Sequence, residues 1–181
     1  MGTSYPSSEQ QNSAVHEAGH AVLADYFGIP IAKVELAVEE DVHNNGGCCW
    51  VSPGAALVSL QDWFVVLHGG VIACMCVYGD LSAEEADFLS RCEMEELRKW
   101  APMPFSEALI EEQWKKAHRR AVRLLRRRAL ELLHVAGALL KRGSLTAEET
   151  AAAIRSGRKE AKECGCAHRR RVSGKDRPPK C

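Results

Sequence analysis

The chain has 181 residues, of which 46% are hydrophobic and 27% are charged. This length suits one hydrophobic core and leaves too little chain for a second sizeable domain beside it. The composition is that of a globular protein, which excludes collagen-like, low-complexity and wholly disordered chains. We therefore expect one folded domain over residues 1–157 and a basic, disordered tail over residues 158–181.

The formal net charge is zero, but the charges are unevenly distributed along the chain. Residues 1–100 hold 4 Lys and Arg against 15 Asp and Glu, whereas residues 101–181 hold 20 against 9. An acidic half with a net charge of −11 thus precedes a basic half with a net charge of +11. The two halves could attract each other across one fold or bind different partners.

Cysteine content and hydropathy bear on the compartment. The sequence contains 8 cysteines but opens with no signal-peptide pattern, so we expect reduced thiols in the cytoplasm or another reducing intracellular compartment. The most apolar stretch runs from Phe64 to Tyr78 and is interrupted by His68 and two glycines. Because it is shorter than the roughly 20 residues that a membrane span needs, we expect a buried core helix and no membrane span.

The first predicted elements are a helix and a β-hairpin. Ser7 to Gln10 has the form of a capping box, the apolar residues after it have helical spacing, and Gly28 is expected to end the helix. Residues 33–38 and 48–52 contain many strand-forming residues and flank an Asn-Asn-Gly-Gly turn sequence. This arrangement predicts a β-hairpin.

Four more helices are predicted from apolar periodicity, capping boxes and helix-breaking prolines and glycines. They cover residues 59–78, 82–100, 106–142 and 146–157. With the hairpin, they predict a mainly helical α+β fold in which a small hairpin or sheet lies beside the first helix. The last helices are expected to form a carboxy-terminal bundle.

The clearest chemical motif is His16-Glu17-Ala18-Gly19-His20, the H-E-x-x-H pattern, in the middle of the first predicted helix. Histidines four residues apart lie on one face of a helix, so both can bind one metal ion. Catalytic zinc keeps an open position for a water whose pKa it lowers toward about 7. We therefore expect Zn²⁺ on His16 and His20, with Glu17 as the general base that takes the proton of that water. The alternative is a pair of histidines on a core helix without metal.

The residues alone do not identify what packs against Gly19 or which side chain is the third metal ligand. A glycine inside a helix costs about 1 kcal/mol relative to alanine, so Gly19 indicates that something approaches the backbone there. A third metal ligand has to come from elsewhere, and position alone does not favour any of the nearby carboxylates, which are Glu84, Glu85 and Asp87. His43 and His68 are further candidates, for which a turn residue and a core histidine are the favoured interpretations.

Several segments resemble one known family. The run Ala14-Val15-His16-Glu17-Ala18-Gly19-His20-Ala21-Val22 resembles the peptidase domain of the FtsH-type ATP-dependent zinc metalloproteases. Leu67-His68-Gly69-Gly70 is similar to the Leu-Gly-Gly-Arg stretch of that family, with Val71 in place of the arginine. The segment from Ser82 to Phe88 resembles the one that supplies the third metal ligand, with Glu85-Ala86-Asp87 in place of Ser-Asn-Asp. The similarity covers about residues 8–156.

The resemblance implies a zincin-like fold and a zinc metalloendopeptidase that cleaves unfolded or flexible polypeptides. It implies that Asp87 is the third metal ligand beside His16 and His20. It also implies that an extended substrate peptide binds along the strand formed by Cys48, Cys49, Trp50 and Val51. A zinc-stabilised binding module that has lost catalysis is the alternative.

The phosphate-binding pattern G-x-x-x-x-G-K-[ST] does not occur in the sequence. We therefore expect a peptidase without its own ATPase, which would need a separate ATPase to unfold folded substrates. A homo-oligomer is the other partner considered.

Two further clusters carry weaker signals. Residues 118–128 form a basic helical face that could bind nucleic acid, but no aromatic residues alternate with its arginines. A solvated face turned toward the acidic half is favoured, so we expect no nucleic-acid partner. Cys164-Gly165-Cys166-Ala167-His168 departs from the usual Cys-x₂-Cys spacing of zinc sites, and metal binding there is not favoured.

Overall fold

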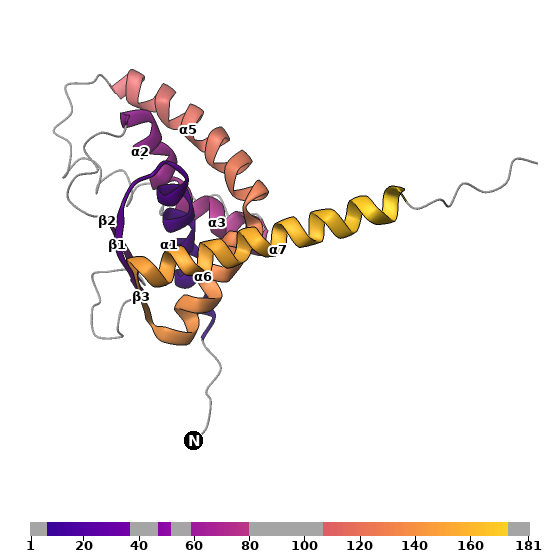
Figure 1. Cartoon of the computed structure of the whole chain (residues 1–181). Helices are drawn as coiled ribbons and strands as arrows, with labels where there is room; N and C mark the ends of the chain where they lie inside the picture. Colours follow the sequence, from indigo (N-terminus) through magenta and orange to yellow (C-terminus); the bar gives the residue numbers. More distant parts are fainter. Residues whose placement is uncertain (1–6, 37–46, 52–58, 80–106, 174–181) are drawn as a thin grey trace, which may run out of the picture.

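The computed structural model describes residues 7–36, 47–51, 59–79 and 107–173, with side chains omitted for residues 107–109 and 165–173. Within these ranges the protein is mainly helical, with a small three-stranded antiparallel sheet, which confirms the coarse fold prediction (Figure 1). The predicted helix over residues 82–100, with its three candidate carboxylates, lies outside the described residues. His43 lies outside them as well.

Helix α1, Ser8–Tyr26, is the central helix of the protein. Its capping box is confirmed: the Ser7 hydroxyl accepts a hydrogen bond from the Gln10 backbone N–H at 3.2 Å, and the Gln10 side chain accepts one from the Ser7 N–H at 3.1 Å. Gly28 follows the helix with a φ of +69°, a conformation that favours glycine. From Ala14 to Ala24 every residue is buried except His16 and His20, which are partly buried, so the H-E-x-x-H motif lies at the edge of the core.

The sheet has the order β2-β1-β3. Strand β1, Ile31–Leu36, pairs antiparallel with β2, Gly47–Val51, as the hairpin prediction requires. Strand β3, Ser144–Thr146, was not predicted, because three residues between two helices are too few to show an alternating pattern. The outer side of β2 is not paired with any strand in the described part of the chain.

Two helices replace the single one predicted over residues 59–78. Helix α2, Leu60–Leu67, begins at the N-cap Ser59, and α3, Gly69–Tyr78, ends at Gly79, which has a φ of +95°. The glycines of α3 allow a very close crossing with α1, since a Cβ on Gly19 would lie 2.1 Å from the Gly69 carbonyl oxygen. The backbone approach that Gly19 predicts is therefore that of Gly69.

Leu60–Tyr78 is the one segment among the described residues whose length and mean hydropathy, 1.6, would allow a membrane crossing. In this structure 56% of that window is buried inside the protein. Core helices of water-soluble proteins have the same composition, so this segment does not decide between the two environments.

The single long helix predicted over residues 106–142 is wrong. The chain forms α5, Glu107–Arg127, and α6, Ala129–Arg142, separated at Arg128, whose φ of −117° and ψ of 23° are not helical. The Arg128 guanidinium binds both carboxylate oxygens of Glu131, at 2.9 and 2.8 Å, and lies 4.5 Å from the centre of the Tyr26 ring. The break lets α6 turn back and bury its apolar face against α1.

The last helix, α7, Ala147–Ser173, is longer than predicted. Its capping box is confirmed, because Thr146 Oγ1 accepts a hydrogen bond from the Glu149 N–H at 3.3 Å and Glu149 accepts one from the Thr146 N–H at 2.9 Å. Gly157 does not end the helix but lies where α7 crosses α6, and a Cβ there would be 2.5 Å from the Glu131 Cα. Beyond this crossing α7 projects away from the other helices (Figure 1).

Two ion pairs join the acidic half of the sequence to the basic half. Arg120 on α5 binds Asp62 on α2 at 2.6 Å, and Arg158 on α7 binds Asp25 on α1. Arg158 also approaches Glu131 at 3.3 Å. The opposite charges of the two halves therefore attract each other, at least at these two points.

Two glycine substitutions test the helix crossing. We expect Gly157→Ala to lower the free energy of unfolding by about 1–3 kcal/mol, because the new methyl group would meet the α6 backbone. Gly137→Ala on α6 is the matched control: its Cβ would meet nothing within 4 Å, so its higher helix propensity should raise stability by up to about 1 kcal/mol. Urea unfolding followed by circular dichroism measures both. Equal stability of the two variants would contradict the crossing.

Candidate metal centre

The two histidines of the motif face each other on α1. Their Nε2 atoms are 3.1 Å apart, and their ring centres are 4.8 Å apart. Two nitrogen ligands about 2.0–2.1 Å from a tetrahedral zinc ion lie about 3.3 Å from each other. The spacing of His16 and His20 therefore fits shared ligation of one ion.

A backbone carbonyl orients His20. The His20 Nδ1 atom lies 2.8 Å from the Val66 carbonyl oxygen at the end of α2. Since a carbonyl only accepts hydrogen bonds, Nδ1 donates its proton, and Nε2 keeps the lone pair that points toward His16. Metal-binding histidines are commonly fixed in this way by a hydrogen bond on the other ring nitrogen.

Burial keeps both imidazoles neutral. It lowers the pKa of His16 to about 3, with a smaller contribution from His20, and it also lowers the pKa of His20. A neutral imidazole is the form that binds metal, so no proton competes for these nitrogens near neutral pH.

Glycines make the space for the rings. A Cβ on Gly70 would lie 2.3 Å from the His16 ring, so the imidazole occupies the volume that a side chain on α3 would fill. Gly19 and Gly69 bring the two helix backbones together directly beside it. The site is therefore built into the crossing of α1 and α3.

Glu17 projects from the same helix toward the sheet. It is only 5% exposed, and burial raises its pKa to about 8. A Cβ on Gly47 would lie 2.7 Å from the Glu17 Cγ, which places the side chain against strand β2. Burial raises the pKa of the Cys49 thiol, and the nearby Glu17 carboxylate adds to that shift. The structure thus brings the predicted base next to the predicted substrate-binding strand.

That strand presents mixed surfaces. Cys48, Cys49 and Val51 are partly buried, whereas Trp50 is 47% exposed and donates an indole hydrogen bond to Glu35 at 2.8 Å.

The described residues contain no group of three or more His, Cys, Asp and Glu side chains arranged to hold a metal. The third ligand expected from the resemblance, Asp87, lies outside the described residues, and so do its competitors Glu84 and Glu85.

His68 occupies a core position, as the favoured interpretation has it. Its side chain is 2% exposed, its Nε2 lies 3.0 Å from the Trp114 carbonyl oxygen, and its ring centre is 3.7 Å from that of Trp114. This histidine packs α3 against α5. Of the cysteine cluster near the end of α7, only the exposed Cys164 has a described side chain.

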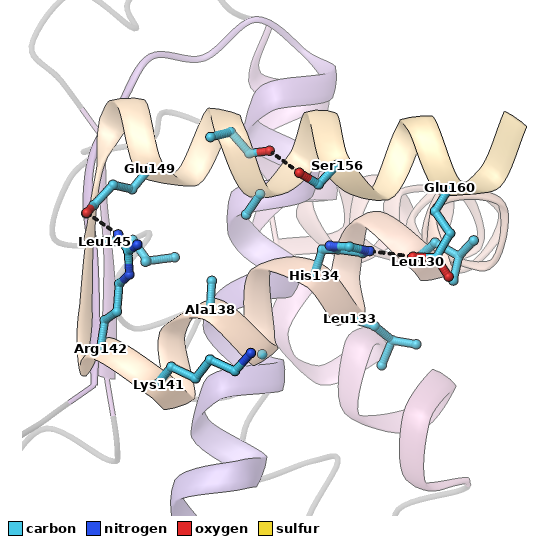
Figure 2. Close-up of a pocket in the computed structure, with 13 residues that line it drawn as sticks. Leu130, Leu133, His134, Ala138, Lys141, Arg142, Leu145, Glu149, Ser156 and Glu160 are labelled. Atoms are coloured by element: carbon cyan, nitrogen blue, oxygen red, sulfur yellow. Dashed lines mark hydrogen bonds and ion pairs between the residues drawn. The ribbon is translucent and has the colours of Figure 1, made fainter. Parts of the chain in front are cut away.

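A groove of about 640 Å³ lies elsewhere, between α6 and α7. Its walls combine small and apolar side chains with charged ones, and a hydrogen bond from His134 to Glu160 and an ion pair from Arg142 to Glu149 cross it (Figure 2). None of the residues of the H-E-x-x-H motif lines it. It is therefore separate from the candidate metal centre.

Comparison of the sequence with known protein families and with curated proteins finds no match. The case for a metal centre therefore depends on the geometry described above and on the motif residues. Two contributors had no clear sequence signal: the Val66 carbonyl that orients His20, and Gly47, which borders Glu17. The sequence did carry a signal for Gly70, because two adjacent glycines in an apolar helix indicate a close approach of another backbone or side chain.

Metal analysis tests the ligand assignment. We expect the purified wild-type protein to bind one zinc ion, and His16→Ala or His20→Ala to lower zinc content to background, because each removes one of the paired Nε2 atoms. His68→Gln is the control, since it changes a nearby buried histidine that contacts Trp114 and should keep the zinc. Inductively coupled plasma mass spectrometry after dialysis gives the content. Loss of zinc only in the His68 variant would reverse the assignment.

Proposed function

We propose that this protein is a zinc-dependent metalloendopeptidase that cleaves unfolded or flexible polypeptides. One observation carries the proposal: the Nε2 atoms of His16 and His20 lie 3.1 Å apart, and the Val66 carbonyl orients His20 so that its lone pair points into the shared space. Glu17, one residue from His16, is buried on the same helix beside a strand. They supply two of the three protein ligands and the base that metal-assisted hydrolysis needs.

Each side chain has a distinct role in this proposal. His16 and His20 would hold Zn²⁺, and Asp87 would complete the ligand set, as the family resemblance implies. Bound zinc would supply a water of lowered pKa and polarise the substrate carbonyl. Glu17 would accept the proton of that water on its carboxylate and pass it to the departing amine. The low exposure of Glu17 keeps bulk water from competing for that proton.

Strand β2 is the proposed substrate-binding edge. One side of it pairs with β1, and its other side is unpaired among the described residues, so an extended peptide can add to the sheet there. Gly47 in this strand contacts Glu17, which would bring the bound peptide close to the base. Backbone hydrogen bonds of this kind recognise extended chains largely independently of sequence, which suits unfolded polypeptides as substrates.

The proposal includes an intracellular, reducing location and no ATPase within the sequence given. A separate ATPase, or assembly into a homo-oligomer, would then control access to folded substrates. A binding module that keeps zinc without turnover is the competing function.

Glu17→Gln tests the base. This variant should retain zinc but lose about 10²–10⁴-fold in the rate of casein cleavage, because an amide cannot accept the proton. Glu9→Gln is the control, an exposed glutamate in the first turn of the same helix, and should cleave at the wild-type rate. The assay is fluorescence release from labelled, unfolded casein with and without a chelator. A zinc-loaded wild type with no measurable, chelator-sensitive cleavage would favour the binding module instead.

Gly47→Ala tests the contact between β2 and Glu17. The new methyl group would lie 2.7 Å from both the Glu17 Cγ and the Glu35 carbonyl oxygen of β1, so the Glu17 side chain and β2 must move apart. We expect kcat to fall at least about 10-fold while zinc content stays at the wild-type level. Gly137→Ala, whose new methyl group has open space, should leave kcat unchanged. Zinc content and circular dichroism separate displacement of Glu17 from loss of the fold. An unchanged kcat in Gly47→Ala would show that β2 does not position the base.

A further inference from the structure

The second half of α5 carries cations that the fold does not neutralise. From Ala117 to Arg127 every exposed residue is an arginine, namely Arg119, Arg123, Arg126 and Arg127. Arg119, Arg123 and Arg127 are spaced four residues apart, so they form one row along the helix. Within the described residues, none of these three forms an ion pair or a hydrogen bond with a carboxylate.

Other basic residues of α5 are neutralised. Lys115 and Lys116, in the first half of α5, pair with glutamates one turn earlier at 2.7 and 2.6 Å. Arg120 turns inward to Asp62. The sequence favoured a basic face turned toward the acidic half, but among the residues that the structure describes only Arg120 of this stretch pairs with a carboxylate of that half. The row of three arginines points to solvent instead.

A second basic row continues on α7. Arg155, Lys159 and Lys162 are exposed at helical spacing, and within the described residues none of them has an ion pair. Arg158, between them, turns inward and binds Asp25 and Glu131. Glu131 also binds Arg128, the residue that follows α5. One carboxylate on α6 therefore links the residue after α5 to α7.

The chemistry of the rows distinguishes between possible partners. Protein interfaces depend on buried apolar and aromatic anchors, and the exposed surface of α5 beyond Ala117 offers none. Guanidinium groups bind phosphate oxygens in bidentate fashion. Eight residues of helix span about 12 Å, which covers three to four nucleotides of one strand at about 3.4 Å each. From Ala117 to Arg127 none of the exposed residues of α5 is aromatic, so the row itself offers no surface for base stacking, which favours a duplex over a single strand.

We propose that the basic rows of α5 and α7 bind the phosphate backbone of double-stranded nucleic acid without reading its sequence. The rows are independent of the metal centre, since none of their residues contacts the H-E-x-x-H motif.

Fluorescence anisotropy with a labelled 20-base-pair DNA duplex tests the proposal. The triple variant Arg119→Gln, Arg123→Gln, Arg127→Gln should bind at least about 10-fold more weakly at 50 mM salt. Because each phosphate contact contributes about 0.9 to the slope of log affinity against log salt, the slope should flatten by about 2.7. The matched control, Lys115→Gln with Lys116→Gln, removes two exposed but already paired charges of the same helix and should change affinity less than about 2-fold.

Further measurements separate the alternatives. Glu17→Gln should bind the duplex like wild type. Duplex binding and peptide cleavage can therefore fail independently of each other. Equal competition by polyglutamate of matched charge would assign the rows to an acidic protein and overturn the proposal, as would binding to phosphatidylserine vesicles in preference to the duplex. Wild-type affinity in the triple variant, with circular dichroism showing an intact fold in all variants, would also overturn it.

Discussion

The close crossing of α1 and α3 is the constraint on which the rest of the structure depends. It exists because Gly19 and Gly69 remove the side chains that would otherwise separate the two backbones, and because Gly70 leaves room for an imidazole. Any Cβ at these three positions would come within 3 Å of the opposite helix. The same crossing that completes the core therefore seats His16 against α3, so stability and the candidate site share one set of contacts.

This packing explains the electrostatics of the site. Two partly buried histidines and a buried glutamate lie close together on α1, and burial favours the neutral form of each one. Such clusters of perturbed ionisable groups are typical of functional sites. A divalent cation placed between the imidazoles would offset the cost of burying them and would favour the ionised form of the nearby carboxylate. The arrangement is thus consistent with a binding site for a cation rather than with a purely apolar core.

Charge organises the outer layer in a different way. Asp25, Asp62 and Glu131 each take one or two arginines from the basic half, and these pairs hold α5, α6 and α7 around α1. Exposed pairs add little stability, but Glu131 is buried and binds arginines from two elements, so it fixes where α5 ends and how α7 crosses. The arginines that remain face solvent because the described helices beside them supply no further acid.

The sequence by itself determined the local elements and the chemical identity of the site. Capping boxes at Ser7 and Thr146 and the stop at Gly79 could be predicted because each depends on hydrogen bonds or backbone angles within a few residues. The pairing of His16 with His20 could be predicted because helical spacing alone brings them together.

Only the tertiary structure decided the features that depend on distant residues. It ended the long helix at Arg128, whose guanidinium binds the nearby Glu131 and also packs on the ring of Tyr26, about 100 residues away in the sequence. It also extended α7 beyond Gly157. A glycine at this position predicts a helix end, but Gly157 instead packs against Glu131. It paired β3 with β1, oriented His20 through Val66 and placed Glu17 against Gly47. These contacts arise when helices and strands pack, and periodicity within one segment carries no information about which backbone will lie across from it.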